Sequence, residues 1–553
     1  MSREHVDVLI VGAGISGVGA GCRLRERCPD KAFAILEARG AIGGTWDLFR
    51  FPGIRSDSDM FTLCYPFRPW SGAQAIVDGS SILDYIHQTA REHGIDQRIR
   101  FHHRVVAAEW SSADARWTVE VERTDTGETV QMSCGFLFTC TGYYRYDEGY
   151  TPEFQGIERF GGEIVHPQFW TDDTDHSGKR VVVIGSGATA VTLIPALAPR
   201  AEHVTMLQRS PSYIVSLPAV DPVAGLLGRV LPTRLAYPVV RWKNVVLALA
   251  IYGFSRSRPV AMKRLLRRLL ERRLPPGYDV DTHFNPRYEP WDQRLCVVPD
   301  GDLFDAIGAG RVSVVTDRIE RFTETGLALA SGSELEADLI VTATGLKMVP
   351  FGGIRLGVDG SDVELPDALV YRGMLLSGVP NMAFAFGYTN QSWTLGADLT
   401  CEQVCRLLNH MDRFGYTQCM PRNGDPAITG VQFFELTSGY VLRAIDQFPR
   451  QGSKDPWRRE QHYARNRRSL RRAPIDDPAL EFSRAAPTPR QRRRSPPKTD
   501  SEPMDSTHTL GANNSLKRFA RFASRQLVTT SSIEQSTRRP GDGEPSARHR
   551  TRA

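Results

Sequence analysis

The chain has 553 residues, of which 41% are hydrophobic and 24% charged, an ordinary composition for a soluble globular protein of two or three domains. The net charge of +6 comes from residues 484–553, where 15 Lys and Arg stand against six Asp and Glu, so the remaining chain favours no nucleic-acid partner. The longest apolar run, residues 245–254, is too short to cross a membrane. Nine scattered cysteines without a Cys-x-x-Cys pair indicate reduced thiols, a cytoplasmic location and no metal site.

The first predicted unit is a strand, a glycine turn and a helix, a combination that binds dinucleotides. Gly12, Gly14 and Gly17 follow the pattern Gly-x-Gly-x-x-Gly. The first glycine permits the turn, the second admits a pyrophosphate, and the third lets helix and strand pack closely. The next strand ends at Glu37, whose carboxylate can accept hydrogen bonds from both ribose hydroxyls and disfavours a 2′-phosphate, so we expect FAD or NAD here. The predicted strands of this unit are residues 6–11, 32–36 and 135–139.

The same plan then begins again. Gly185, Gly187 and Ala190 form a second glycine turn. At the strand end that corresponds to Glu37, this copy has Arg209 and no acid, which favours the 2′-phosphate of NADP. The alternative is that Arg209 is a solvated surface arginine. The predicted strands of this unit are residues 179–184, 204–207 and 338–342.

The predicted fold class is therefore α/β, with two Rossmann-like dinucleotide-binding domains, the second inserted into the first. Predicted helices form an insert, and the Pro-, Ser- and Arg-rich end of the chain is expected to be a disordered tail. The expected boundaries are 1–143 and 347–484 for the two parts of the first domain, 144–346 for the second domain with its helical insert at about 220–278, and 485–553 for the basic tail.

The sharpest motif lies just before the second glycine turn. Phe160, Gly162, His166 and Trp170 form the pattern Phe-x-Gly-x-x-x-His-x-x-x-Trp. This resembles the fingerprint of class B flavoprotein (Baeyer–Villiger) monooxygenases, although Thr171 stands where that fingerprint continues with Pro or Asp. In the related N- and S-oxidising flavin monooxygenases, Phe or Tyr would replace the tryptophan. Other stretches are similar to the ethionamide-activating type of these enzymes, namely residues 43–47, 51–59, 290–294 and 388–395.

The resemblance covers about residues 6–482 and implies that the first domain binds FAD and the second NADPH. It implies an FAD site lined by Gly12, Gly14, Ser16, Gly17, Glu37, Gly44, Thr45, Trp46, Asp47, Leu48, Asp57 and the backbone of Val105. It implies an NADP site formed by Arg55, Ser56, Gly185, Ser186, Gly187, Ala188, Thr189, Ala190, Gln208 and Arg209. His166 is expected in the linker between the two domains, where it would couple their movement.

The resemblance also implies that Arg294 is a catalytic arginine over the flavin. Reduced flavin and O₂ form a flavin peroxide, which decays when water reaches it, so an oxygenating site needs a fixed cation and must exclude water. Arg294 suits this task because arginine does not lose its proton, and Asp57 is the second expected catalytic residue because it can orient that arginine. The alternatives are a surface arginine in a loop and an ordinary loop carboxylate.

We therefore expect an NADPH-consuming monooxygenase that inserts one oxygen atom from O₂ into a small ketone, giving an ester, or into the sulfur of a thioether or thioamide. One alternative is an N- or S-oxidising flavin monooxygenase without ketone activity. Another is a catalytically silent, membrane-associated nucleotide binder. A disulfide reductase is disfavoured because no cysteine pair follows the first nucleotide motif. Peripheral membrane contact through the helical insert or the basic tail is a further hypothesis.

Overall fold

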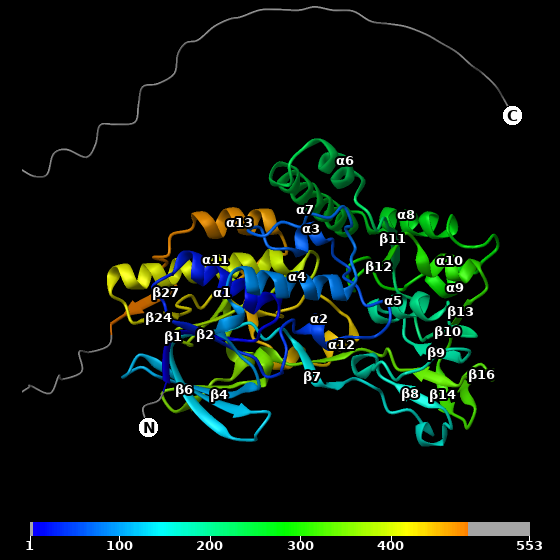
Figure 1. The fold of residues 1–553 in the computed structure, drawn as a ribbon, viewed down its shortest axis with the longest axis horizontal. Helices are drawn as coiled ribbons and strands as arrows, with labels where there is room; N and C mark the ends of the chain where they lie inside the picture. Colours follow the sequence, from blue (N-terminus) through cyan, green and yellow to red (C-terminus); the bar gives the residue numbers. More distant parts are fainter. Residues whose placement is uncertain (1–3, 485–553) are drawn as a thin grey trace, which may run out of the picture. The chain divides into compact units, whose positions relative to one another are not determined.

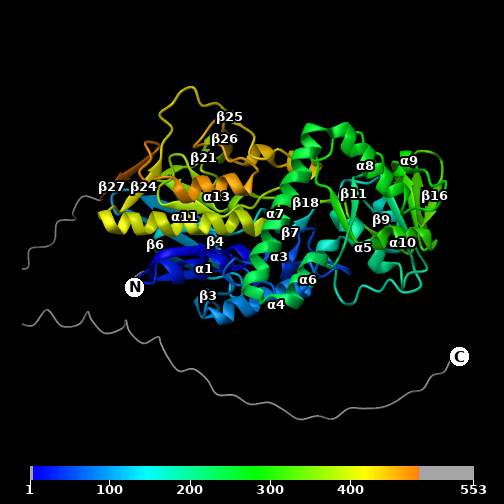
Figure 2. The same cartoon turned by 90° about the horizontal axis from the view of Figure 1, so that it is seen from above.

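The computed structural model describes residues 4–484, and a nine-stranded sheet forms the centre of the first nucleotide-binding unit (Figures 1 and 2). Its order is β20-β19-β4-β5-β6-β1-β2-β3, with β23 also paired to β6. β1 runs parallel to β2 and β6, so the carboxyl ends of these three strands meet at one edge. The strands are β1 (Glu4–Val11), β2 (Phe33–Leu36), β3 (Ile99–Arg100), β4 (His103–Ser111), β5 (Arg116–Arg123), β6 (Thr129–Thr139), β19 (Arg355–Val358), β20 (Ser361–Asp362) and β23 (Met382–Phe384).

Both faces of this sheet are covered. Helices α1 (Ile15–Arg27) and α11 (Trp393–Phe414) pack against each other, and the core beneath them includes Val8 and Ile10 of β1. Leu9 points to a second core on the opposite face. Burial on both faces explains why β1 is a continuous apolar run without polar alternation. Strands β19 and β23 and helix α11 all come from beyond residue 353, so the chain returns to the first unit, as predicted.

The second unit contains a five-stranded sheet of order β13-β10-β9-β17-β8, in which every pairing is parallel. Its strands are β8 (Glu163–Val165), β9 (Arg180–Ile184), β10 (His203–Gln208), β13 (Val312–Thr316) and β17 (Leu339–Val341). Helices α5 (Ala188–Leu197) and α10 (Asp302–Gly308) pack together beside it. An antiparallel sheet follows, with β14 (Ile319–Phe322), β15 (Gly326–Leu329) and β16 (Glu334–Glu336).

The chain passes between the two units twice, and the two crossings pair with each other. β7 (Tyr144–Gly149) leaves the first unit and lies antiparallel to β18 (Leu346–Met348), which returns to it. These two strands lie next to the boundaries that we expected near residues 143 and 346. The domain boundaries themselves stay predictions.

The predicted helical insert is present between β11 (Ile214–Leu217) and β12 (Cys296–Pro299). It consists of α6 (Pro222–Val230), α7 (Thr233–Ser257), α8 (Pro259–Glu271) and the short α9 (Val280–Phe284). Helix α7 packs on α3 (Met60–Leu63) of the first unit. Within residues 4–484, no helix combines the length and the apolar character needed to cross a membrane.

The remaining elements belong to the first unit and its surface, except η2 and η3, which lie on either side of β8 in the second unit. The α-helices are α2 (Thr45–Leu48), α4 (Gly79–Glu92), α12 (Gly439–Leu442) and α13 (Tyr463–Arg472). The strands are β21 (Leu369–Tyr371), β22 (Leu375–Leu376), β24 (Gln418–Pro421), β25 (Gly430–Val431), β26 (Arg450–Gly452) and β27 (Leu480–Ser483). The 3₁₀ turns are η1 (Asp96–Arg98), η2 (Ile157–Arg159), η3 (Pro167–Phe169), η4 (Pro350–Gly353), η5 (Leu365–Asp367) and η6 (Ile445–Gln447).

One predicted strand is longer than expected. The segment 135–139 is only the end of β6, which begins at Thr129 because its first half pairs antiparallel with β5 before its second half pairs with β1. The expected tail, residues 485–553, lies outside the described residues, as do residues 1–3.

Candidate active site

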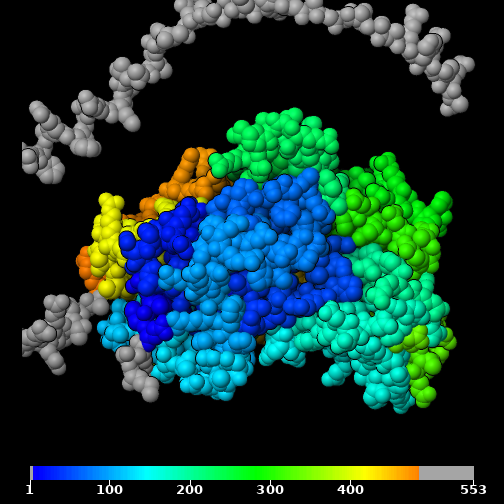
Figure 3. Space-filling view, viewed as in Figure 1, coloured from blue at the N-terminus to red at the C-terminus, as the bar shows by residue number. Residues whose placement is uncertain are grey.

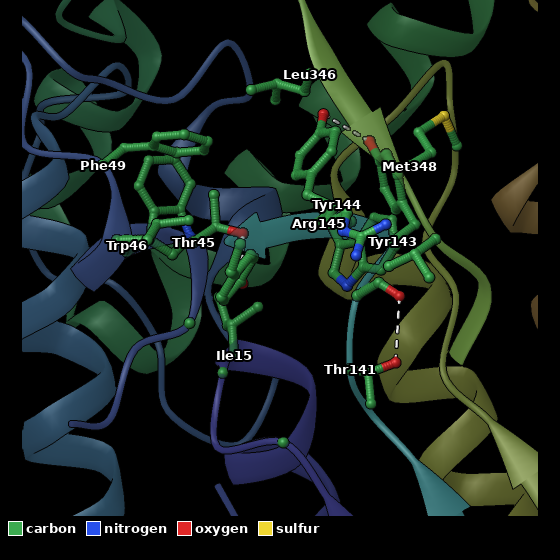
Figure 4. Close-up of a pocket in the computed structure, with 18 of the residues that line it drawn as sticks. Ile15, Thr45, Trp46, Phe49, Thr141, Tyr143, Tyr144, Arg145, Leu346 and Met348 are labelled. Atoms are coloured by element: carbon green, nitrogen blue, oxygen red, sulfur yellow. Dashed lines mark hydrogen bonds between the residues drawn. The ribbon is translucent and has the colours of Figure 1, made fainter. Parts of the chain in front are cut away.

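A cavity of about 890 Å³ lies at the carboxyl ends of β1, β2 and β6 and extends to the start of α5 in the second unit (Figure 4). In open parallel sheets, ligands bind outside the carboxyl ends of the strands, at the point where the strand order reverses. Of the predicted FAD residues, the cavity is lined by Gly12, Gly14, Ser16, Glu37, Gly44, Thr45, Trp46, Leu48, Asp57 and Val105.

The first glycine turn has the geometry that its sequence predicts. Gly12 has a φ of +101°, and a Cβ there would lie 2.7 Å from the carbonyl oxygen of Cys140. A Cβ on Gly17 would lie 1.8 Å from the carbonyl oxygen of Gly12, so this glycine is required by close packing of helix and strand. A Cβ on Gly14 would lie 3.6 Å from the Cα of Gly44 and 4.0 Å from the carbonyl oxygen of Gly43, which are ordinary contact distances. The space beside Gly14 is therefore a cradle that a side chain would fill, as expected for a pyrophosphate.

Glu37 directly follows β2 and is only 6% exposed. The backbone N–H groups of Ala13 and Arg39 donate to its two carboxylate oxygens at 2.8 and 3.0 Å. Burial raises the pKa of Glu37, and these two donors oppose the rise. The carboxylate is thus fixed at the cavity wall with acceptor capacity left for a ribose. On the other side of the turn, Trp393 Nε1 donates to Ser16 Oγ at 2.7 Å.

The segment of α2 lies along the cavity, but one predicted residue turns away from it. Thr45 Oγ1 is 3.2 Å from the hydroxyl oxygen of Tyr146 (Figure 4 shows Thr45 and Trp46 at the wall). Asp47 is buried and forms ion pairs with Arg39 at 2.6 Å and Arg50 at 3.1 Å, and it does not line the cavity. Asp47 therefore lies behind the cavity wall and not at its surface.

The second glycine turn contributes less to this cavity than the first. Gly185 has a φ of +138°, and a Cβ there would lie 2.4 Å from the carbonyl oxygen of Ala343. A Cβ on Gly187 would meet nothing within 4 Å, which leaves open space above the turn. Of the six predicted turn residues, only Ala188 and Thr189 line the cavity; Gly185, Ser186, Gly187 and Ala190 do not.

The two residues expected to read the second nucleotide point in different directions. Gln208 is buried, and its amide nitrogen donates to the carbonyl oxygen of His283 at 2.8 Å and to Thr316 Oγ1 at 2.9 Å. Arg209 follows the end of β10, is exposed, and within the described residues forms no ion pair. Arg209 is thus free for an incoming anion, whereas Gln208 is held inside the protein. Both remain predicted NADP residues.

Asp57 and Arg294 come together at the cavity from distant parts of the sequence. Arg294 Nε lies 3.3 Å from Asp57 Oδ2, and both residues line the cavity. Burial by itself would lower the pKa of Arg294, but the Asp57 charge and the nearby hydroxyls of Tyr143, Tyr440 and Tyr144 raise it. Arg294 precedes β12, so its backbone is anchored by a strand. Arg294 is therefore a permanently charged cation at the wall, and Asp57 orients it.

Arg55 connects the two units directly. Its Nη1 donates to Asp302 at the start of α10 at 2.7 Å, and its Nη2 donates to the carbonyl oxygen of Val191 in α5 at 3.4 Å. Its buried Nε has no partner within the described residues. The neighbouring Ser56 is also buried, and its Oγ accepts from the backbone N–H of Ser58 at 3.0 Å. Arg55 and Ser56 both line the cavity.

Of the fingerprint residues, only His166 lines the cavity. The carbonyl oxygen of Gly345 accepts from its Nε2 at 3.1 Å, and its Nδ1 accepts from the backbone N–H of Gln168 at 3.2 Å, so the ring is neutral and protonated on Nε2. Burial lowers the pKa of His166 accordingly. It follows β8 and bonds to the returning crossing, which agrees with a place beside the linker.

The other three fingerprint residues are structural parts of the second unit. A Cβ on Gly162 would lie 2.5 Å from the carbonyl oxygen of Asp338. Phe160 is buried against Phe322, with ring centroids 6.4 Å apart. Trp170 is 7% exposed and meets His176 edge to face. The fingerprint therefore describes packing around the second sheet and includes no residue that bonds Arg294.

The sequence reasoning missed the aromatic wall beside Arg294. The ring of Tyr143 lies 5.3 Å from the rings of both Phe386 and Trp393, and its hydroxyl is 3.0 Å from that of Tyr144 (Figure 4). Phe434 completes this wall, 5.5 Å from Phe386. The sequence contained a signal for the two tyrosines, because they follow Thr141 and Gly142 just after the predicted strand 135–139.

Comparisons with known proteins agree with this site. A model of the family described as flavin-binding monooxygenase-like matches residues 6–353. The chain is 56% identical over 482 residues to the FAD-containing monooxygenase EthA of Mycobacterium tuberculosis, which covers 87% of this chain and 98% of that protein. The chain belongs to the flavin-binding monooxygenase-like family. The expected enzyme class, a flavin monooxygenase, is confirmed with it.

Two further relatives of this flavin-binding monooxygenase-like chain extend the comparison. The putative FAD-containing monooxygenase MymA of Mycobacterium tuberculosis is 53% identical over 489 residues, or 88% of this chain and 99% of that protein. A solved structure of oxidized steroid monooxygenase bound to NADP has a TM-score of 0.68 and 22% identity, and the match covers 86% of this chain and 99% of that chain. The last match confirms the expected two-unit α/β fold.

Proposed function

We propose that the protein is an FAD- and NADPH-dependent monooxygenase that inserts one oxygen atom from O₂ into a small ketone or into the sulfur of a thioether or thioamide. The observation that carries the proposal is the pair of Arg294 and Asp57 in a cavity that reaches both glycine turns. A nucleotide-binding protein without catalysis would have no need for a half-buried, oriented cation between its two nucleotide sites.

The residues of the first turn fit FAD. The cradle at Gly14 suits a pyrophosphate, and the N-terminus of α1 supplies amide donors and a positive dipole end. The Glu37 carboxylate suits the ribose hydroxyls. The flavin ring would then lie towards Trp46 and Tyr143, which both line the cavity. Bound FAD supplies the redox chemistry, by taking hydride from NADPH and reducing O₂.

The residues of the second turn and of the crossing fit NADPH. Open space above Gly187 and the exposed Arg209 suit the pyrophosphate and the 2′-phosphate. Thr189 and Arg55 lie where the second unit meets the cavity, so they suit the nicotinamide half. The NADPH proposal thus rests on two arginines, the exposed Arg209 and the half-buried Arg55.

The residues around the reacting position stabilise negative charge and exclude water. Arg294 stays protonated at every physiological pH and offers a planar fork of donors, and Asp57 fixes its direction. Phe386, Trp393 and Phe434 give an apolar boundary that strengthens this charge interaction. Either a carbonyl or a sulfur atom of an apolar substrate can be brought beside the cation.

An N- or S-oxidising enzyme without ketone activity is the remaining enzymatic alternative. Trp170 favoured the Baeyer–Villiger type in the sequence, but this side chain lies in the core of the second unit and does not line the cavity. It therefore does not select the substrate by contact. Peripheral membrane contact is a separate proposal, because it depends on the helical insert and not on this cavity.

The test is an aerobic screen of NADPH consumption with ketones and sulfides of graded length, run with ¹⁸O₂ and product identification. The proposal expects one labelled oxygen atom in an ester or a sulfoxide for each NADPH consumed. Sulfoxides without any ester would select the alternative enzyme. A yellow protein that NADPH reduces, but that forms only hydrogen peroxide with every compound, would contradict the proposal.

A further inference from the structure

The outward side of the helical insert is apolar. Along α7, Leu235, Val239, Trp242, Val246 and Phe254 recur at helical spacing on one side. Their exposed fractions range from 37% for Trp242 to 60% for Leu235. Helix α6 and the following turn add Val223, Leu226, Val230 and Leu231. We call these nine residues the α6–α7 apolar face; both helices lie at the surface (Figure 3, green).

The opposite side of α7 faces the protein and carries apolar residues, among them Tyr237, Val240 and Val245, together with buried polar contacts. Arg241 is buried, and its Nη1 donates to the carbonyl oxygens of Phe61 at 2.7 Å and Cys64 at 3.0 Å. The amide nitrogen of Asn244 donates to Asp59 Oδ1 at 2.9 Å. An ordinary surface helix buries its apolar stripe and exposes its polar side. Because the buried polar contacts fix the rotation of α7, its apolar stripe stays exposed.

The charge around this face is one-sided. Residues 222–270 contain ten Lys and Arg and no Asp or Glu. Five of them, Arg229, Arg234, Arg258, Arg264 and Arg268, are exposed, and within the described part of the chain none forms an ion pair. Arg229 lies on α6, Arg234 lies on α7 and Arg258 directly follows α7, whereas Arg264 and Arg268 lie on α8. An exposed apolar stripe on helices with uncompensated arginines is typical of a segment that lies in the interface of an anionic bilayer.

We propose that the α6–α7 apolar face docks on an anionic lipid bilayer, with α7 parallel to the membrane plane. The apolar side chains enter between the head groups, and the five arginines pair with lipid phosphates. A second copy of the chain is a poorer occupant, because a twofold interface would bring the same arginines together. Residues 484–553 are also a poorer occupant of this face, because their 15 Lys and Arg against six Asp and Glu would repel the arginines of the insert.

The experiment is co-sedimentation of the full-length protein with phosphatidylcholine vesicles and with equimolar phosphatidylcholine–phosphatidylglycerol vesicles. We expect binding to the anionic vesicles that decreases as salt rises, and weak binding to the neutral ones. The double variant Leu226→Glu/Val239→Glu should bind anionic vesicles at least about tenfold more weakly. The matched control Phe414→Glu/Val431→Glu changes exposed apolar residues on α11 and β25 and should bind like the unmodified protein.

Two further variants keep the test decisive if the acidic variant is unstable. Arg229→Gln/Arg234→Gln leaves the apolar side chains in place and should weaken binding only to anionic vesicles. Trp242→Phe should remove the blue shift of tryptophan emission that accompanies vesicle binding. The melting temperature and flavin content of each variant are first compared with those of the unmodified protein. A loss of folding or of FAD is thereby distinguished from a loss of vesicle binding.

Three results would overturn the proposal. The first is unchanged vesicle binding by Leu226→Glu/Val239→Glu. The second is loss of binding when only tail arginines are changed, in Arg490→Gln/Arg492→Gln/Arg493→Gln/Arg494→Gln, while the insert variants still bind. The third is a stable dimer of the unmodified protein that the insert variant converts to a monomer, with no vesicle binding by either.

Discussion

Arg294 Nε lies 3.3 Å from Asp57 Oδ2, and 237 positions of sequence separate these two cavity-lining residues. Asp57 belongs to the loop between α2 and α3 of the first unit, whereas Arg294 precedes β12, which pairs with β11 on the far side of the helical insert. The ion pair therefore joins the two units at a position where the cavity wall is charged on one side and aromatic on the other.

Cofactor choice is tested at Arg209. This exposed arginine follows β10 without an ion-pair partner in the described chain, so an added 2′-phosphate gains a charge-assisted contact. NADPH should be used far better than NADH. Arg209→Ala should raise KM for NADPH roughly ten- to hundredfold, as expected for losing ~1.5–3 kcal/mol, and leave NADH use nearly unchanged. Equal use of both cofactors by the unmodified protein would refute the assignment.

Flavin retention is tested at Gly14. Valine there would fill the cradle beside Gly44 and keep a pyrophosphate away from the N-terminus of α1. Gly14→Val should therefore purify without yellow colour. Gly424→Val is the matched control, because a Cβ on Gly424 meets nothing within 4 Å, and it should keep its FAD. Stoichiometric FAD in Gly14→Val, measured by absorbance after denaturation, would show that the turn has another role.

The link between the units is tested at Asp302. Its carboxylate accepts from Arg55 Nη1 at 2.7 Å, and Arg55 lines the cavity. In Asp302→Asn the arginine loses its charged partner and its fixed direction, so KM for NADPH should rise about three- to tenfold, in keeping with ~1 kcal/mol for a partly exposed ion pair. FAD content should not change. A variant with normal NADPH kinetics would mean that Asp302 does not position Arg55.

The pH dependence of stability is tested at His166. Burial lowers the pKa of His166, and Gln168 donates to its Nδ1, so the folded protein holds the neutral ring. The unfolded ring titrates near about pH 6.5. Below that pH the unfolded state binds the extra proton and folding stability falls. The melting temperature should therefore decrease more from about pH 7.5 to about pH 5.5 in the unmodified protein than in His166→Gln. Parallel curves would contradict this.

The sequence predicted what neighbouring residues determine. Gly12, Gly17 and Glu37 lie within one strand–turn–helix–strand unit, and their spacing fixes a geometry that the structure reproduces. The sequence also predicted the helical insert, because the length and composition of a segment are enough to predict that it forms helices. It did not predict which side of α7 is buried, because that depends on the backbone carbonyls of Phe61 and Cys64, far away in the chain.

Contacts between remote segments were beyond single-sequence reasoning. The bond of Arg55 to Asp302 and the packing of Tyr143 on Trp393 have no local signature, since each forms only when segments far apart in the sequence fold together. The resemblance implied that Gln208 belongs to the NADP site, yet the structure directs its amide towards His283 and Thr316. Strand alternation explains this, because successive side chains point to opposite faces.

The central claim is that Arg294 stabilises negative charge during oxygen transfer. Arg294→Ala should fold, retain FAD and accept hydride from NADPH, because those steps depend on the glycine turns and Glu37. Losing one preorganised charge removes ~3–4 kcal/mol, or roughly 10²–10³ in the rate of product formation. Arg294→Lys should recover little, because an ammonium lacks the planar fork that faces Asp57.

The most direct measurement is a single-turnover experiment in which the enzyme is reduced by NADPH without oxygen and then mixed with O₂ and substrate. Flavin absorbance, hydrogen peroxide and oxygenated product are quantified together. The account predicts normal reduction in Arg294→Ala, reoxidation that releases hydrogen peroxide, and almost no oxygenated product. Oxygenated product formed by Arg294→Ala at the unmodified rate would contradict it.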